Sequence, residues 1–131
     1  MNQTLGAVSL LVHDYDEALR FYVSVLGFDL IEDVVLPEGG RWVVVRPRGS
    51  IGTGLLLAQA KNAAETASVG QQAGGRVFLF LHTDDFERDY HAYHRRGVRF
   101  LETPRQEAYG RVAVFEDLYG TKWDLLERFR G

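Results

Sequence analysis

The first third of the chain alternates between apolar and polar stretches in a way that predicts one strand, one helix and three more strands. Leu5 to Val12 is aliphatic and β-branched, as expected of a buried strand. Asp14 follows as a helix N-cap, and Glu17 three residues later completes a capping box. Apolar residues then recur at helical spacing up to Gly27, a residue type that commonly ends a helix. The pattern predicts three further strands, over 28–36, 41–46 and 54–58.

A segment of different character follows this first group of elements. Residues 61–75 are small and polar, rich in Ala, Gln, Ser and Gly, with no strand or helix periodicity that would bury one face. They predict a surface linker.

The same order of elements returns after the linker. A strand over 77–81 precedes a helix that we expect Asp84 to cap and Gly97 to end, and strands over 98–101, 111–115 and 122–126 follow. The N-caps and the terminal glycines repeat at an offset of 70 residues, whereas the apolar face of the helix matches better at 71. Any α+β domain contains capped helices between strands, but several landmarks in one order at nearly one offset indicate an internal duplication.

The duplication predicts the domain organisation. A chain of 131 residues suits one compact domain. Half of it cannot bury both faces of its sheet alone, so each copy must pack against a second one. We therefore predict a single α+β domain of two tandem βαβββ modules, over 1–60 and 76–128, joined by the linker at 61–75.

Two segments resemble the signatures of a known superfamily. Residues 12–28, VHDYDEALRFYVSVLGF, are similar to the first-helix signature of the vicinal oxygen chelate superfamily, and residues 115–127, FEDLYGTKWDLLE, resemble its closing turn and strand. This superfamily includes glyoxalase I, extradiol dioxygenases, epimerases, fosfomycin-inactivating transferases and bleomycin-binding proteins. The resemblance implies that the two βαβββ modules form an open, barrel-like cup.

The resemblance also implies where a metal would be held. Enzymes of the superfamily usually bind one divalent metal through four side chains, on the first and last strand of each module. Transferred through the repeat, these positions are Ala7, Leu56, Phe78 and Asp124. The first three have no atom that binds a metal, and catalytic metals normally need about three protein ligands. We therefore expect neither the family metal nor another cofactor.

Strand alternation indicates which other side chains point the same way as these four positions. They are apolar and aromatic with a few polar groups, a lining that suits a small organic ligand. The competing interpretation is that the same side chains fill the barrel as core. The candidate ligand-binding residues are Ser9, Trp42, Arg46, Leu56, Phe78, Phe80, His82, Tyr109, Arg111 and Asp124.

His82 and Asp124 are the candidates for catalysis. His82 could transfer a proton near neutral pH, although a histidine at this place is more often held by its neighbours at the helix start. A carboxylate in an apolar cup needs a partner or stays protonated, and Arg46 or Arg111 could be the partner of Asp124. Asp124 could otherwise orient a hydroxyl or amine of a ligand.

Composition narrows the classes of partner. The formal net charge of -3 gives no electrostatic attraction to nucleic acid. No apolar run approaches the roughly 18 residues that cross a bilayer, and the start of the chain does not resemble a signal peptide. The absence of cysteine excludes disulfides and thiolate chemistry. We expect a cytoplasmic homodimer that binds neither nucleic acid nor membrane.

The sequence leaves three functions open. The first is a metal-free protein that binds a small organic molecule, similar to the bleomycin-sequestering members of the superfamily. The second is a lyase, oxygenase or isomerase that uses a metal through other ligands, or His82 and Asp124 without a metal. The third is an interaction module without a ligand, which requires the cup to be filled with side chains.

Overall fold

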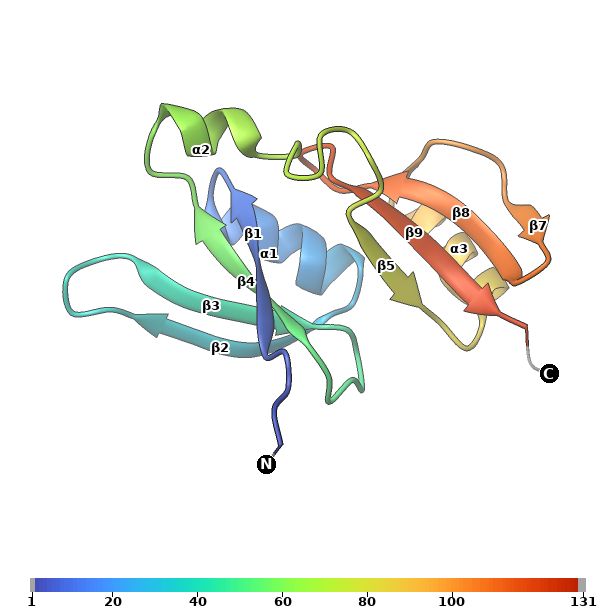
Figure 1. Ribbon diagram of the computed structural model, residues 1–131, viewed down its shortest axis with the longest axis horizontal. Helices are drawn as coiled ribbons and strands as arrows, with labels where there is room; N and C mark the ends of the chain where they lie inside the picture. Colours follow the sequence, from blue (N-terminus) through green and yellow to red (C-terminus); the bar gives the residue numbers. More distant parts are fainter. Residues whose placement is uncertain (1, 130–131) are drawn as a thin grey trace. The chain divides into compact units, whose positions relative to one another are not determined.

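The computed structural model describes residues 2–129 and contains the two modules that the repeat predicts (Figure 1). The chain divides into one compact unit that ends at Val69 and a second that begins at Gly70. The first unit comprises β1 (Ala7–Val12), α1 (Tyr15–Leu19), a π-helical segment η1 (Arg20–Val25), β2 (Asp29–Val35), β3 (Arg41–Arg46), β4 (Gly54–Gln59) and α2 (Ala63–Ser68). The second unit comprises β5 (Leu79–His82), α3 (Phe86–Arg95), β6 (Arg99–Phe100), β7 (Arg105–Glu107), β8 (Gly110–Glu116) and β9 (Lys122–Arg128).

The sheets of the two modules have the same topology. Their strand orders are β1-β4-β3-β2 and β5-β9-β8-β6, with β7 also paired to β8. In each module the first and last strands pair in parallel, with Ser9 opposite Leu56 and Phe80 opposite Asp124. All other pairs among the described strands are antiparallel. The predicted α+β fold of two βαβββ modules is confirmed.

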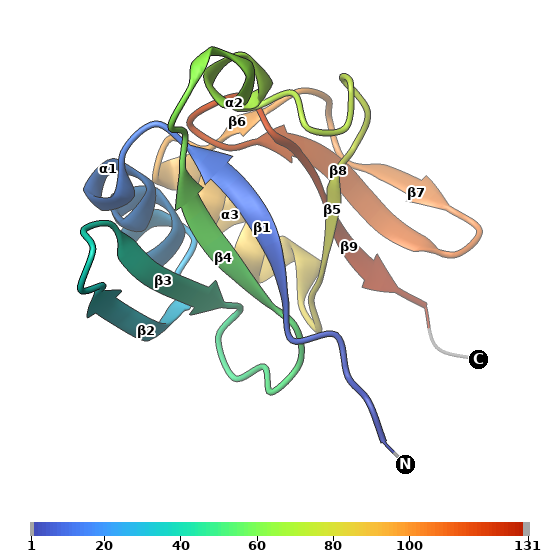
Figure 2. The same ribbon diagram turned by 60° about the vertical axis from the view of Figure 1, so that its left-hand side comes forward.

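In each module the first helix packs against one face of the sheet (Figures 1 and 2). On β1 the side chains of Leu10 and Val12 are fully buried, as expected of residues that alternate towards a helix. In the second module Tyr93 of α3 lies edge-on to Phe115 of β8, which stacks on Trp123 of β9, with ring centroids 5.9 Å apart in both pairs. We call this side the helix face of a module and the opposite side its open face.

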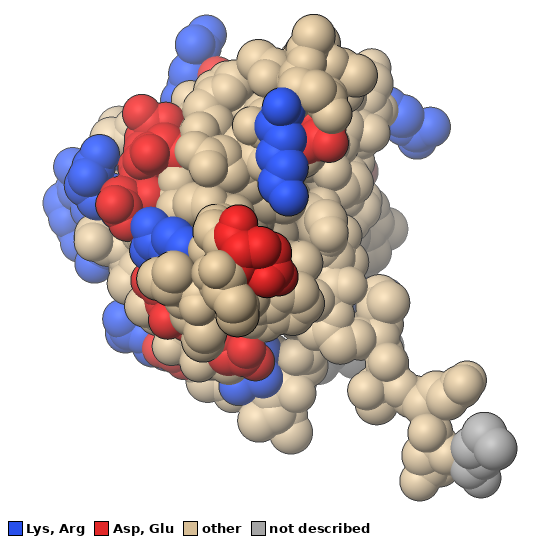
Figure 3. All heavy atoms as spheres, turned by 90° about the vertical axis from the view of Figure 1, so that its left-hand side faces the viewer, with Lys and Arg blue, Asp and Glu red and all other residues tan. Residues whose placement is uncertain are grey.

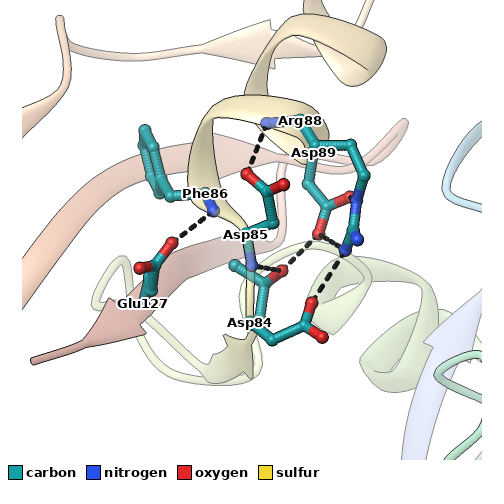
Figure 4. Close-up of polar contacts among 7 residues, drawn as sticks. Asp84, Asp85, Phe86, Arg88, Asp89 and Glu127 are labelled. Atoms are coloured by element: carbon teal, nitrogen blue, oxygen red, sulfur yellow. Dashed lines mark hydrogen bonds and ion pairs between the residues drawn. The ribbon is translucent and has the colours of Figure 1, made fainter. Parts of the chain in front are cut away.

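The cap of α3 corrects one prediction from the repeat. Asp85, not Asp84, is the N-cap: its side chain accepts a hydrogen bond of 3.1 Å from the backbone N–H of Arg88 (Figure 4). Asp84 instead binds the guanidinium of Arg88 at 3.0 Å. The true caps, Asp14 and Asp85, are therefore 71 residues apart, the same offset as the apolar helix face.

One extra residue in the first helix explains why the terminal glycines repeat at 70 instead. The N–H of Leu26 donates to the carbonyl of Phe21, five residues earlier, whereas in α3 the N–H of Arg96 donates to the carbonyl of Ala92, four residues earlier. A π-turn of this kind closes over one more residue than an α-turn. The first module thus takes up one residue in η1 that the second module lacks.

The π-turn leaves the end of the helix in register with the sheet. The N–H of Phe28 donates to the carbonyl of Tyr22 at 2.9 Å, and the N–H of Val98 donates to that of Tyr93 at 3.0 Å. Tyr22 and Tyr93 are both buried, as are Phe28 and Val98. The two modules therefore enter their second strands from equivalent positions despite the difference in length.

The predicted linker contains a short helix. Ala63–Ser68 forms the short helix α2, whose cap is Asn62: its side chain accepts a hydrogen bond of 2.8 Å from the N–H of Glu65. The carboxylate of Glu65 accepts hydrogen bonds from the N–H of Lys61 and from the Asn62 amide. This capping box was present in the sequence, but the Ala-rich composition of the segment hid it.

A buried carboxylate shapes the turn before β9. Asp117 is 5% exposed, and its Oδ1 accepts hydrogen bonds of 2.9 Å from the N–H groups of Tyr119 and Thr121. Gly120 completes the turn at φ 91°, a value that favours glycine. This turn fixes where β9 begins and therefore where Asp124 lies.

Substitution of Asp117 tests the role of this carboxylate. We expect Asp117→Ala to lower the free energy of unfolding by about 2 kcal/mol, because two buried N–H groups lose a charged acceptor. Asp117→Asn keeps an oxygen that can accept both bonds, so its loss should be smaller. Urea denaturation of both variants measures the difference. Equal losses would show that the turn does not depend on this acceptor.

Single-residue deletions test the explanation of the two offsets. Deleting Ser24, an exposed residue of η1, removes the extra residue, and we expect the variant to fold with a loss of about 1–2 kcal/mol in the free energy of unfolding. Deleting His94, which is exposed in α3, leaves that helix one residue short and turns the residues after it by about 100°. This control should lose much more stability. Similar losses in urea denaturation would contradict the explanation.

Candidate functional site

Asp124 lies on the open face of the second module. Its neighbours along β9, Trp123 and Leu125, are buried and point to the helix face, so alternation turns Asp124 the other way. In the sheet it is in register with Phe80 of β5 and Val114 of β8. Asp124 therefore stands between two apolar residues contributed by neighbouring strands.

The Asp124 carboxyl is buried and incompletely hydrogen bonded. The residue is 9% exposed, and its Oδ1 has no hydrogen-bond partner within residues 2–129. Burial raises the pKa of Asp124 above its ordinary value of 3.8; the positive charge of Arg105 opposes this shift, and the negative charge of Glu102 adds to it. An unsatisfied buried carboxyl costs folding free energy, so this oxygen is available to a ligand.

Arg105 holds a network of polar side chains beside Asp124. Its Nε donates to Glu102 at 3.0 Å and its Nη1 donates to Glu107 at 2.8 Å. Hydrogen bonds with Glu107 and Tyr109 raise the pKa of Arg105 further above its ordinary value, so the guanidinium stays charged. These partners hold the guanidinium where it acts on Asp124 through its charge.

Glu102 also completes the edge of the sheet. The strands β6 and β7 pair with separate stretches of β8, and between them the N–H of Val114 donates to the Glu102 carboxylate at 3.0 Å. The sequence pattern does not predict β7, because residues 102–107 are polar and contain a proline. Glu102, Arg105 and Glu107 are therefore not among the predicted site residues. The available signal was the spacing of Arg105 and Glu107, which places both on one face of a strand.

Arg111 requires a correction. It was expected as a partner of Asp124, but in β8 it is Val114 that stands opposite Asp124, and Arg111 points to the helix face. Its guanidinium lies 5.3 Å from the ring centroid of Phe86, and its Nε is 2.6 Å from the carboxylate of Glu87. The structure thus removes Arg111 from the face that carries Asp124.

The other candidates of the second module lie on the open face or at its edge. Phe80 is 60% exposed, and the exposed His82 points the same way by alternation. Phe78 precedes β5 with the same orientation. Tyr109 lies in the turn between β7 and β8, is 46% exposed and binds Arg105. The structure therefore brings Phe80, His82 and Asp124 together on one face.

The candidates of the first module share the open face of their own sheet. Ser9 of β1 and Leu56 of β4 are in register, and Leu56 stands opposite Val44 of β3. Trp42 and Arg46 lie two residues to either side of Val44 and so share its orientation. Trp42 is 42% exposed, and the Nε of Arg46 has no hydrogen-bond partner in the described part of the chain.

The donor set does not fit the metal that the fold family uses. Ala7, Leu56 and Phe78 offer no metal-binding atom, which leaves Asp124 as the only donor of the four positions. Elsewhere within residues 2–129 no group of three or more His, Cys, Asp or Glu side chains is arranged to hold a metal.

Acidic and basic side chains are mixed on the face of the molecule drawn in Figure 3. They lie side by side there, rather than in one basic surface. The described residues include no helix that is long and apolar enough to cross a membrane.

Replacement of Asp124 should stabilise the protein at neutral pH. Because its pKa is raised in the folded state, ionisation of Asp124 costs stability as the pH rises. We expect Asp124→Asn to raise the free energy of unfolding by about 1 kcal/mol at pH 7. The gain should shrink on acidification and vanish below pH 3.8, where the carboxyl is protonated in both states. A variant less stable than wild type at pH 7 would contradict this.

Comparisons with known proteins agree with the fold. A profile of the Glyoxalase/Bleomycin resistance protein/Dioxygenase superfamily matches residues 4–125. An uncharacterised protein of Shewanella frigidimarina is 55% identical over 97% of this chain and 95% of its own length. The crystal structure of TnmS3, an antibiotic binding protein from Streptomyces sp. CB03234, is 31% identical and covers 98% of both chains with a TM-score of 0.80. That of UcmS2 is 27% identical, covers 96% of this chain and 98% of its own, and has a TM-score of 0.83. This chain belongs to the Glyoxalase/Bleomycin resistance protein/Dioxygenase superfamily.

Proposed function

We propose that this protein binds a small organic molecule on the open face of a module, without the metal of its enzymatic relatives. The observation that carries the proposal is the composition of the four family metal positions. Ala7, Leu56 and Phe78 cannot bind a metal, whereas they and their neighbours provide an apolar surface. The similarity to TnmS3, described as an antibiotic binding protein, supports binding rather than catalysis.

Exposed aromatic side chains support this proposal. Trp42, Phe80 and Tyr109 are 42%, 60% and 46% exposed. Covering apolar surface with a ligand gains about 25 cal/mol per Å² removed from water. On each open face one polar atom lacks a hydrogen-bond partner among the described residues, Nε of Arg46 in the first module and Oδ1 of Asp124 in the second, and each would orient a ligand bound on its own face. A few polar groups among mostly apolar ones are typical of sites that bind small molecules.

The remaining candidates follow from their places on the open faces. Ser9 and Leu56 would contact a ligand bound on the open face of the first module, and Phe78 and His82 would contact one bound on the open face of the second. The homodimeric state and the cytoplasmic location remain predictions from the sequence.

Metal titration tests the metal-free part of the proposal. We expect tag-free protein to show no one-to-one binding of nickel, zinc, manganese or iron(II) in calorimetry, because one carboxylate cannot replace about three ligands. Tight one-to-one binding that Asp124→Ala abolishes would contradict the proposal. It would favour a metal-dependent lyase, oxygenase or isomerase instead.

The same protein serves to test ligand binding. Aromatic antibiotics should quench the fluorescence of the exposed Trp42 in a saturable way. The variant Trp42→Phe is the control: it keeps the fluorescence of the buried Trp123, and we expect this fluorescence not to change when the compound is added. If no compound of a broad panel binds more tightly than about 1 mM, the binding function is refuted.

A further inference from the structure

Resting on the proposed function, we propose that the ligand is an organic cation: a protonated amine carried on an apolar or aromatic body. In this assignment Asp124 binds the ammonium group and Phe80 packs against the body. Both residues belong to the second module, where they stand opposite each other on β9 and β5.

The first support is the state of Asp124 itself. It is more than nine-tenths buried, and its Oδ1 has no partner within the described residues. A carboxylate oxygen only accepts hydrogen bonds, so the missing partner must be a donor. A ligand that supplies an N–H or O–H group would remove the cost of leaving this oxygen unpaired.

The second support is the local charge. Within residues 2–129, the positive charge that acts most strongly on the Asp124 carboxyl is that of Arg105, which donates to both Glu102 and Glu107. One positive and three negative groups leave this set of four with a formal charge of -2. A neutral hydroxyl would satisfy the hydrogen bond and leave that charge in place. A protonated amine would donate the hydrogen bond and also reduce the negative charge. Its hydrogen bond to the carboxylate would be about twice as strong as one between neutral groups.

The other charged side chains near this end of β9 have partners of their own. The Nζ of Lys122 donates to the carbonyl of Gly75 at 2.9 Å. Glu116, which is in register with Lys122, binds the guanidinium of Arg99 at 3.3 Å. Glu116 and Arg99 neutralise each other, whereas Lys122 keeps its positive charge; counted with the set of four, it leaves a formal charge of -1 beside Asp124.

The third support is the aromatic ring beside the carboxyl. Phe80 is 60% exposed although it lies in the middle of β5, so its ring is free to cover a ligand. Aromatic faces attract cations within about 6 Å of the ring centroid. A carboxylate next to an exposed aromatic ring therefore presents two features that favour the same chemical group.

Three probes that share one indole ring separate the contributions. Tryptamine is a cation, tryptophol is its neutral alcohol, and indole-3-propionate is an anion. In ¹H–¹⁵N NMR titrations of the full chain we expect tryptamine to shift the amide signals of Phe80 and Asp124. Tryptophol should bind about tenfold more weakly and indole-3-propionate more weakly still.

Two variants make the assignment specific. Asp124→Asn should lower the affinity for tryptamine about tenfold, to that of tryptophol, and leave tryptophol unchanged. The matched control is Asp84→Asn, which removes one negative charge from a side chain 83% exposed at the start of α3 and should change neither affinity. Phe80→Leu keeps the carboxyl and should weaken both probes. The NMR spectra of the free variants report whether each one folds.

Several outcomes would overturn the inference. With the wild type, these are equal affinities for tryptamine and tryptophol, or no tryptamine binding up to about 10 mM. With the variants, they are an equal loss of affinity for both probes in Asp124→Asn, or a loss of tryptamine affinity in Asp84→Asn as large as that in Asp124→Asn. A neutral antibiotic that binds wild type and Asp124→Asn equally would also refute the amine assignment. In that case the proposed small-molecule binding would stand, so the two failures are distinguishable.

Discussion

The parallel pairing of the first and last strand of each module is the constraint on which the rest of the structure depends. Parallel neighbours need a crossover connection, which in both modules includes the helix that follows the first strand. That helix covers one face of the sheet and leaves the other for chemistry. The same pairing places Phe80 beside Asp124, although the two residues are far apart in the sequence. The candidate site is thus a direct product of the topology.

The site on this face is costly to the fold. Asp124 is buried, its Oδ1 has no hydrogen-bond partner among residues 2–129, and Glu102 adds a second negative charge nearby. A leucine at this position would suit an apolar face better, as Leu56 does at the equivalent place in the first module. Local destabilisation of this kind is commonly found where function requires it. This asymmetry between the copies agrees with the proposal that a ligand of the second module is held through Asp124.

The sequence predicted the elements whose signals are local. The cap at Asp14, the terminal glycines Gly27 and Gly97 and most strands depend on neighbouring residues, and they are where the pattern placed them. The resemblance to the superfamily then predicted Asp124 as a residue of the cup, and the repeat gave Leu56 as its counterpart in the first module.

The features that were missed depend on contacts that a linear pattern does not contain. The π-turn η1 exists because Phe28 must reach the same place in its sheet as Val98, which only a comparison of both modules reveals. The strand β7 is defined by its pairing with β8, and next to it the Glu102 carboxylate accepts from the N–H of Val114 at a break in the edge of the sheet. Arg111 could be named as a possible partner of Asp124 from the sequence, but the register of β8 and β9, which puts Val114 opposite Asp124, is not contained in a linear pattern.

The central claim is that this superfamily scaffold holds an organic molecule without a metal. Native mass spectrometry of the protein, incubated with cell extract and then with excess nickel, zinc, manganese and iron(II), tests it most directly. We expect a complex whose added mass is that of one organic molecule, lost on denaturation, and no species with a metal ion in fixed one-to-one ratio. A stoichiometric metal complex, with or without an organic molecule, would contradict it.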